Sequence, residues 1–282
     1  MAAQQPRLGR VGFLSQKLDQ PQDGAVAYQS TTGLDHDQIQ ELVGRIHQVL
    51  GPSDRRPGRP PVLGLYRSVL LTLVLLRQNL AQTVAAEWFG VSQSTVSRVF
   101  RRIAPLIGQV LCPHTPPLPE ALSGRVVLVD GALIPTRDHA SHRKPNFNAK
   151  HRRAGVTVQV MATLDGSLLA VSDPVEGRTH DKTAYILTGL ADLLADHEVV
   201  ADLGYQGTPT IRPRRKRPGH KHHTPADKIW NTSVSRIRWA VEHAIAHLKA
   251  WKILATGYRA RLAELPTVIR IVTNLEHYRQ GW

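Results

Sequence analysis

Residues 124–131, GRVVLVDG, form a short apolar run that ends in an acidic residue and a glycine. A continuous apolar run of this length is typical of a strand that is buried on both faces of a sheet. A second run of this kind, EVVADLG at 198–204, also ends in an aspartate that is soon followed by glycine. The sequence therefore predicts two buried strands that end at Asp130 and Asp202.

Helix and strand patterns alternate around these two strands. Residues 155–174 predict two strands joined at Asp165–Gly166, since an Asp-Gly pair suits the positive φ angles of a tight turn. Residues 180–197 predict a helix whose apolar stripe is formed by Ile186, Leu187, Leu190, Leu193 and Leu194. Residues 233–254 predict a long final helix with an apolar stripe of Ile237, Val241, Ala244, Ile245 and Leu248. We therefore expect residues 124–282 to form an α/β domain.

The N-terminal part of the chain divides into three zones. Residues 1–34 mix Gln, Gly, Pro and Asp without periodicity and predict a poorly ordered arm. Residues 35–111 carry helical patterns and predict an all-α domain. Residues 112–123 hold several prolines, which stop helices, and predict a linker to the α/β domain.

Charge and composition narrow the possible partners and locations. The chain has 282 residues, with 36 Lys and Arg against 22 Asp and Glu, and a formal net charge of +14. This excess favours a polyanionic partner, nucleic acid before a membrane surface. No apolar run reaches the roughly 20 residues of a membrane span, and the N-terminus lacks the apolar stretch of a secretory signal. Cys112 is the single cysteine, which excludes an intramolecular disulfide and fits a reducing cytosol.

Residues 80–103, LAQTVAAEWFGVSQSTVSRVFRRI, carry the pattern of a helix-turn-helix. Ala86 is the small residue inside the first helix, Gly90 lies at the turn, and Ser92 is a suitable N-cap for the second helix. The candidate DNA contacts are the polar side chains off the buried stripe, namely Gln93, Ser94, Thr95, Ser97, Arg98, Arg101 and Arg102. The alternative is a pair of helices in a bundle without contact to DNA.

The two strand-terminal aspartates are a candidate metal site. If Asp130 and Asp202 meet on neighbouring strands, their charges repel unless a cation lies between them. Oxygen ligands and a nucleic-acid partner favour Mg²⁺ or Mn²⁺. The alternative for each is a turn residue at a strand exit. Glu242, beside the stripe of the final helix, is a third candidate, although Arg238 one turn earlier could hold it in a surface ion pair.

Several motifs together resemble insertion-sequence transposases of the IS5 type. They are the helix-turn-helix, VDG at 129–131, THDKTAY at 179–185, DLGYQG at 202–207 and WAVEHAIAHLKAWKIL at 239–254, in the family's order. The resemblance covers about residues 35–280. It implies a DDE superfamily endonuclease domain with a ribonuclease H-like fold, a mixed sheet flanked by helices. It also implies that Asp130, Asp202 and Glu242 are catalytic and bind two ions of Mg²⁺ or Mn²⁺.

The resemblance also implies a reaction and its partners. Two metal ions would serve phosphodiester transfer, in which transposon ends are cut and the 3′-hydroxyl is joined to target DNA. We expect double-stranded DNA, both terminal inverted repeats and target, as the partner. We further expect a homo-oligomer on DNA, no membrane, no nucleotide cofactor, and a location in the bacterial cytosol. The alternatives are a catalytically inactive, domesticated DNA-binding protein and a ribonuclease of the same fold.

Basic residues outside the helix-turn-helix are further candidates for contacts with DNA phosphates. The stretch RPRRKRPGHKHH at 212–223, named the basic loop below, contains no acid and predicts a loop that gains order on DNA. The alternative is a solvated loop. The candidate phosphate contacts are Arg214, Arg215, Lys216 and Arg217 in this loop, with Lys150 and Lys249 near the metal site.

The remaining polar and aromatic residues receive structural interpretations. His243 follows Glu242 where relatives often carry Arg, so a phosphate contact there would need a protonated imidazole. Asp181 is interpreted as an acid in the first turn of a helix, which the helix dipole favours. Packing of the final helix is the role expected for the tryptophans, namely Trp230, Trp239 and Trp251.

Overall fold

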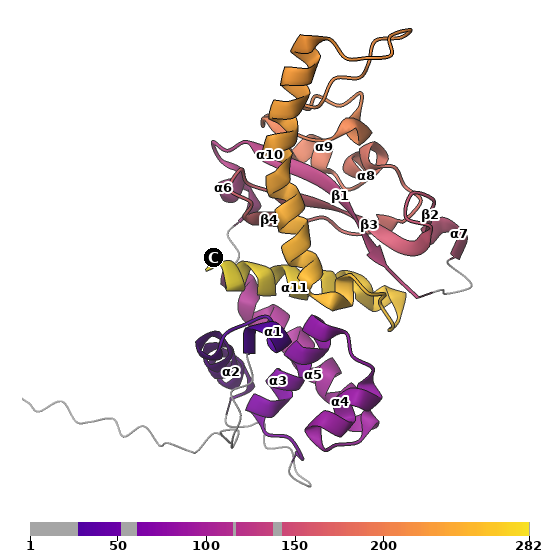
Figure 1. Ribbon diagram of the computed structural model, residues 1–282. Helices are drawn as coiled ribbons and strands as arrows, with labels where there is room; N and C mark the ends of the chain where they lie inside the picture. The colour runs from indigo at the N-terminus through magenta and orange to yellow at the C-terminus, as the bar shows by residue number, and fades with distance from the viewer. Residues whose placement is uncertain (1–27, 52–60, 115–116, 138–142, 282) are drawn as a thin grey trace, which may run out of the picture.

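The computed structural model describes residues 28–51, 61–114, 117–137 and 143–281. A group of helices from the N-terminal part lies beneath an α/β part (Figure 1). The long helix α10 (Pro225–Ala250) crosses the α/β part, and α11 (Leu265–Gln280) lies between the two parts (Figure 1). The expected arm lies outside the described residues up to residue 27.

The N-terminal part is helical, as predicted. Its helices are α1 (Tyr28–Thr32), α2 (His36–Leu50), α3 (Leu65–Gln78), α4 (Gln82–Phe89), α5 (Gln93–Leu111) and the 3₁₀ turn η2 (Cys112–His114). Helix α2 starts in a capping box, because Asp35 accepts from the backbone of Gln38 and Gln38 accepts from the backbone of Asp35. The arm does not extend to residue 34, since Leu34 is fully buried and Gly33 touches Trp251 so closely that a Cβ there would lie 2.7 Å from the indole.

The α/β part is built on one mixed sheet. Its strands are β1 (Val127–Pro135), β2 (Phe147–Asn148), β3 (Arg153–Ala162), β4 (Leu168–Val171), β5 (Val175–Glu176) and β6 (Val199–Val200). The order is β2-β3-β1-β6, with β4 and β5 also paired to β3. Strand β1 is antiparallel to β3 and parallel to β6. The expectation that Asp130 ends its strand is wrong, because β1 continues past it to Pro135 and keeps pairing with β3.

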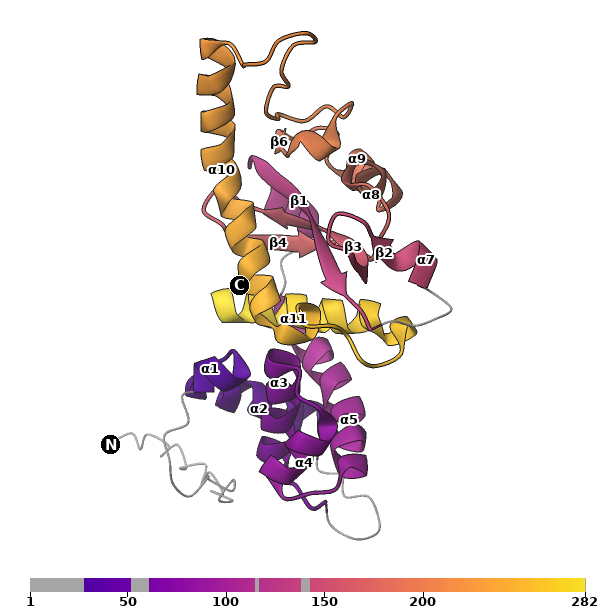
Figure 2. The ribbon, with the colours of Figure 1, turned by 45° about the vertical axis from the view of Figure 1, so that its right-hand side comes forward.

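Two helical layers cover the sheet, with α10 on one face and α8 (Asp181–Leu187) and α9 (Leu190–Leu193) on the other (Figure 2). The alternation of β1 explains this arrangement. Leu128 belongs to the core under α10, whereas Val127 and Val129 belong to the core under α8 and α9. A continuous apolar strand can therefore be buried on both sides, as predicted.

The helices depart from the sequence expectations in four places. The segment 180–197 is not one helix, because Gly189 takes a left-handed φ of 73° and separates α8 from α9; Ile186 and Leu187 of the expected stripe are exposed. Helix α10 begins at the N-cap Thr224, earlier than expected, and Ile237 of its predicted stripe is 40% exposed. The expected linker contains the helix α6 (Leu118–Leu122), and α11 was not predicted.

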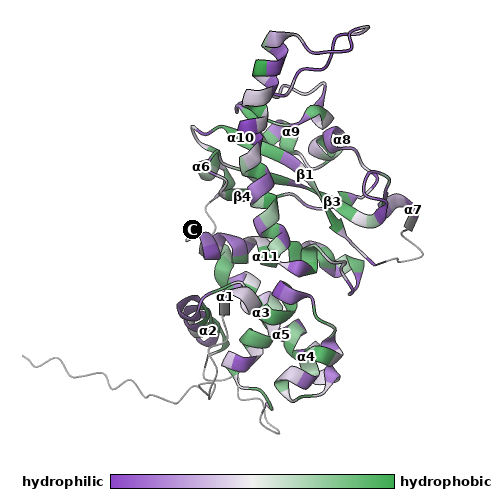
Figure 3. Ribbon diagram, viewed as in Figure 1, coloured by the Kyte–Doolittle hydropathy of each residue, from purple (hydrophilic) through white to green (hydrophobic). Residues whose placement is uncertain are grey.

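Short helical segments complete the fold. They are α7 (Arg143–Asn146), η4 (Leu203–Tyr205), η5 (Lys252–Leu254) and η6 (Leu262–Glu264). Hydrophilic residues dominate the loop beyond the upper end of α10 (Figure 3), which contains the basic loop. Among the described helices, none has a stretch both apolar and long enough for a bilayer crossing.

The two parts share one hydrophobic core through α11. Ile271 and Val272 of α11 belong to the same cluster as Ile107 of α5 and Leu168 of β4. A hydrogen bond of 3.3 Å from Asn274 Nδ2 to the carbonyl of Gly108 adds a polar contact to this packing. The last helix of the chain therefore joins the N-terminal helices to the sheet.

Candidate functional site

The pairing of β1 with β6 brings Asp130 and Asp202 together. The strands are parallel neighbours with Leu128 opposite Val200, and each aspartate follows two residues later. Neighbouring strands lie about 4.8 Å apart. Because side chains alternate along a strand, Asp130 faces the same side as Leu128, toward α10.

Asp130 is a desolvated carboxylate with one cationic partner. Its Oδ1 accepts a hydrogen bond from the backbone of Gly131 at 2.9 Å, and its Oδ2 lies 3.0 Å from Nη2 of Arg238 on α10. The pKa of Asp130 is raised to about 6, mainly by burial; Arg238 opposes the rise, and the charges of Asp202 and Asp181 add to it. Arg238 therefore pairs with Asp130 and not, as the helical spacing allowed, with Glu242.

Asp202 lies where the chain leaves the sheet. It is the N-cap of η4, and its Oδ1 accepts from the backbone of Gly204 at 2.7 Å. This contact is the turn role that we considered as an alternative. Its charge also raises the pKa values of Asp130 and Asp181, so the turn holds it close to both.

Glu242 lies one turn after Arg238 on α10 and its side chain is exposed. No hydrogen bond or ion pair joins it to Asp130 or Asp202 in the described part of the chain. Nor do any three His, Cys, Asp or Glu side chains of the described ranges converge to hold one metal ion. The joint metal-binding role of Asp130, Asp202 and Glu242 thus stays a prediction.

The structure adds a carboxylate that the sequence interpretation left aside. Asp181, in the first turn of α8, lies against Gly131 and Gly204, the glycines that follow Asp130 and Asp202. Burial raises the pKa of Asp181, and the charge of Asp202 adds to the effect. The sequence signal that could have indicated Asp181 is the presence of Gly131 and Gly204 soon after the two aspartates, because a glycine leaves room for a third side chain.

These residues fit a divalent cation. Asp130 already has a positively charged partner, Arg238. The side chain of Gln159 beside Gly131 is fully buried, and its Nε2 has no hydrogen-bond partner among the described residues. Carboxylate oxygens are the ligands that Mg²⁺ and Mn²⁺ prefer. A pair of these carboxylates would hold such an ion, either Asp130 with Asp202 or Asp202 with Asp181.

Both lysines proposed for phosphate contacts lie beside the carboxylates. The charge of Lys150 lowers the pKa of Asp181. The pKa of Lys249 on α10 is lowered by burial and by Arg153, while Asp130 opposes the shift. The carboxylates are therefore flanked by positive charge from two separate segments of the chain.

The basic loop is largely exposed and is attached to α10 through Arg212 and Arg214. Arg214 forms an ion pair with Asp227 at 3.2 Å and lies over the ring of Trp230. The side chains of the other three candidates in the loop, Arg215, Lys216 and Arg217, are exposed. A hollow of about 390 Å³ beside Trp230 has Leu203 and Arg215 in its walls, so that it extends from the turn after Asp202 to the basic loop.

The predicted helix-turn-helix consists of α4 and α5. Gly90 takes a left-handed φ of 66° between them, and Ser92 caps α5 by accepting from the backbone of Thr95. Four of the candidate DNA contacts are exposed on α5, namely Gln93, Ser94, Arg98 and Arg101. The other three are half-buried: Thr95, Ser97 and Arg102.

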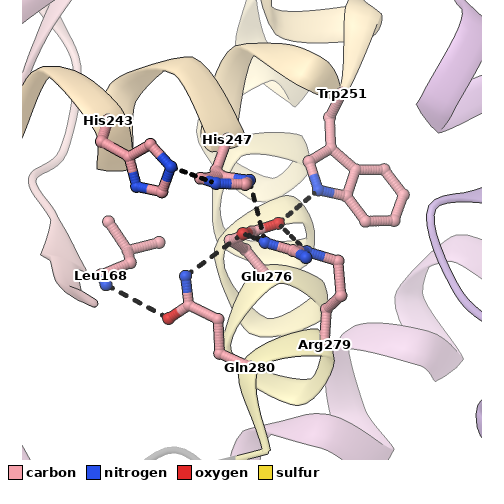
Figure 4. Close-up of polar contacts among 7 residues, drawn as sticks. All are labelled: Leu168, His243, His247, Trp251, Glu276, Arg279 and Gln280. Atoms are coloured by element: carbon pink, nitrogen blue, oxygen red, sulfur yellow. Dashed lines mark hydrogen bonds and ion pairs between the residues drawn. The ribbon is translucent and has the colours of Figure 1, made fainter. Parts of the chain in front are cut away.

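His243 belongs to a chain of polar contacts between α10 and α11 (Figure 4). Its Nε2 lies 3.0 Å from Nε2 of His247, whose Nδ1 lies 3.0 Å from Nη2 of Arg279. Because arginine only donates, His247 Nδ1 accepts and a neutral His247 donates to His243. Arg279 also binds Glu276, which accepts from Trp251 at 3.0 Å (Figure 4). This chain connects α10 with α11.

The expectation for the tryptophans holds in part. Trp251 is fully buried, as predicted. Trp239 is 63% exposed and stacks on His243, with ring centroids 5.1 Å apart, so the packing role assigned to it is wrong. Trp230 is 38% exposed and donates to the carbonyl of Arg212.

Comparison with known proteins gives the family. The family model described as DDE superfamily endonuclease matches residues 129–276, and the helix-turn-helix of DDE superfamily endonuclease matches residues 62–113. A putative transposase for insertion sequence element IS112 from Streptomyces albus G is 31% identical over 224 residues, covering 79% of this chain and 83% of the relative. A probable transposase for insertion sequence element IS702 from Microchaete diplosiphon is 25% identical over 235 residues, covering 79% and 84%.

No solved structure matches the chain significantly. The endonuclease match begins within β1 and ends in α11, so it includes Asp130, Asp202 and Glu242. The helix-turn-helix match contains α4 and α5. The chain belongs to the DDE superfamily endonucleases and carries their helix-turn-helix domain.

Proposed function

We propose that the chain is a DNA transposase that cuts transposon ends and joins the freed 3′-hydroxyl to target DNA by two-metal-ion phosphodiester transfer. Asp130, Asp202 and Glu242 are the proposed catalytic metal ligands, and Mg²⁺ or Mn²⁺ is the proposed ion. The observation that carries this proposal is the adjacency of the desolvated Asp130 on β1 and of Asp202, which directly follows the parallel strand β6, within the endonuclease match. The names of both relatives, each called a transposase, support it.

The metal ions would supply activation of the attacking oxygen and stabilisation of the leaving oxygen. The chain's own side chains position the reactants. Asp130 and Asp202 present oxygens at one point of the sheet, and the charges of Lys150 and Lys249 beside them attract a DNA phosphate. Glu242 follows Arg238, the partner of Asp130, by one turn of α10, so the two side chains lie on the same side of this helix.

A ribonuclease H-like fold is the proposed classification of the endonuclease part. It is supported by an antiparallel β1, β3 and β4, a β6 parallel to β1, and helices on both faces. We assign residues 35–111 to the DNA-binding domain, 112–123 to the linker and 124–282 to the catalytic domain. A homo-oligomer on DNA in the bacterial cytosol is the proposed assembly.

DNA recognition is assigned to two surfaces. The exposed Arg98 and Arg101 on α5 lie where the second helix of a helix-turn-helix meets the major groove. The basic loop, with the exposed Arg215, Lys216 and Arg217, is proposed to bind phosphates near the cut. Both surfaces predict binding that weakens with salt.

The test compares cutting with binding. Asp202→Asn should abolish metal-dependent nicking of DNA that carries the element's terminal repeats, and should leave the affinity for that DNA within twofold. Asp192→Asn, an acid in the first turn of α9, is the matched control and should nick as wild type does. Equal nicking by Asp202→Asn and wild type would refute the catalytic role, and binding without nicking by wild type would favour the inactive DNA-binding protein.

A further inference from the structure

The side chains around Gly204 leave one space between two carboxylates. A Cβ added at Gly204 would lie 2.8 Å from Oδ1 of Asp202 and 2.9 Å from Oδ2 of Asp181. The two oxygens thus border one small space, which only a glycine leaves open. Asp202 Oδ1 is held there by the hydrogen bond that it accepts from the backbone of Gly204, and the two negative charges repel unless a cation lies between them.

A second space lies at Gly131, on the neighbouring strand. A Cβ there would collide with Oδ1 of Asp181 and lie 3.6 Å from Nε2 of Gln159. Gln159 is opposite Gly131 in the β1–β3 pairing, and its side chain is fully buried. Asp181 therefore reaches from α8 to both β1 and the turn η4, and each of its oxygens lies at a position that a side chain would otherwise fill.

Gln159 is oriented by its other amide atom. The hydroxyl of Tyr205, which is fully buried, donates to Oε1 of Gln159. The amide nitrogen is thereby turned toward Gly131 and Asp181, where it has no hydrogen-bond partner in the part of the chain described. A buried N–H without a partner is costly, so this donor indicates an acceptor in the site, such as a ligand water or phosphate oxygen.

We propose that Asp181 is a metal-binding carboxylate of this site, which shares a divalent cation with Asp202. The inference rests on the proposed function and deepens it, because it adds a ligand beyond Asp130, Asp202 and Glu242. Asp181 itself has no hydrogen-bond partner in the described residues, and the basic side chains near it are Lys150, His180 and His151. None of these forms an ion pair with it, so a metal ion is the group that balances the Asp181–Asp202 pair.

The pair also explains how two ions fit one site. Asp130 lies on the α10 side of β1, whereas Asp181 approaches Gly131 from α8. Asp202 lies beside both, since its charge acts on each. One ion would then be bound by Asp130 and Asp202 and the other by Asp181 and Asp202, each with waters and phosphate oxygens completing the shell.

The test is Mn²⁺ binding by the full chain without DNA, measured by isothermal titration calorimetry and by the loss of the free Mn²⁺ signal in electron paramagnetic resonance. Asp181→Asn should weaken Mn²⁺ binding at least tenfold or remove one of two bound ions. Asp192→Asn again serves as the control, because it removes an exposed first-turn acid of α9 that does not belong to this carboxylate site. Gly204→Ala should weaken binding as well, because it fills the space between the oxygens.

Three outcomes are decisive. The inference is overturned if Asp181→Asn binds Mn²⁺ with an affinity and stoichiometry within twofold of wild type while Asp202→Asn loses Mn²⁺ binding. That result would leave the proposed function intact. Absence of Mn²⁺ binding by wild type would overturn both. Loss of an ion in Asp181→Asn, with an unchanged circular dichroism spectrum, would support the inference. The isosteric substitution relieves charge repulsion, so the folded state is retained.

Discussion

Asp130→Asn is expected to make the metal-free protein more stable while it abolishes DNA cutting. Burial holds the pKa of Asp130 at about 6 against 3.8 for an ordinary aspartate. A carboxyl group whose pKa is raised in the folded state stabilises the fold at pH values below its unfolded pKa of 3.8. This stabilisation is lost as the pH rises through the folded pKa of about 6. Each pKa unit corresponds to about 1.4 kcal/mol, so an ionised Asp130 costs about 3 kcal/mol at pH 8. Asparagine has no charge and avoids this cost.

Urea unfolding with EDTA measures the difference. At pH 8 the variant should be more stable than wild type by about 3 kcal/mol, and at pH 5 by about half of that, because wild type is then largely protonated. The value of about 3 kcal/mol already includes the ion pair with Arg238, because Arg238 lowers the pKa of Asp130 and so offsets part of the effect of burial. Added Mg²⁺ should stabilise wild type more than the variant, since it binds the native state.

An Asn variant of equal or lower stability than wild type at pH 8, with unchanged slope of the urea transition, would refute this reasoning. It would mean that Arg238 offsets the desolvation of Asp130 completely. A stability difference that is the same at pH 5 and pH 8 would also contradict it, because the effect would then come from packing and not from the charge.

Further substitutions address the helix-turn-helix, the carboxylate site and the core. Arg98→Ala should weaken DNA binding and reduce the slope of log affinity against log salt by about one, as measured by fluorescence anisotropy. Gly131→Ala should displace Asp181 and abolish metal-dependent nicking. Its affinity for DNA, measured by fluorescence anisotropy, should be unchanged. Trp251→Phe should lower the free energy of unfolding by about 3 kcal/mol, because a buried indole loses its hydrogen bond to a carboxylate on α11, whereas the exposed Trp239→Phe should change it by less than about 1 kcal/mol.

Local patterns predicted the elements whose signals lie within the element itself. The apolar runs before Asp130 and Asp202 became β1 and β6, and Gly90 with Ser92 marked the turn and cap of the helix-turn-helix. These signals depend on backbone geometry and on burial of a continuous segment, which the sequence displays directly. The family resemblance implied a DDE superfamily endonuclease with a helix-turn-helix domain, which the two family matches confirm, whereas the IS5 type stays a prediction.

Features that depend on tertiary contacts were missed. Asp181 read as an ordinary first-turn acid, and only the pairing of Gly131 with Gln159 and the turn at Gly204 show that its oxygens meet Asp202. Helix α11 lacked a strong one-sided pattern because it is buried by the sheet on one side and by α5 on the other. Neither environment is visible in the sequence of the segment alone.

The core shared through α11 sets the geometry of any DNA bound by both parts. Helix α5, which carries Arg98, packs against α11, and α11 contacts the end of α10 through Trp251 and Glu276. The recognised base pairs and the scissile phosphate are then separated by a distance that the protein fixes. The cut should therefore fall at a constant distance from the recognised sequence. If a few base pairs are inserted between the recognised sequence and the original cleavage position, the protein should cut a different phosphate, at the same distance from the recognised sequence as before.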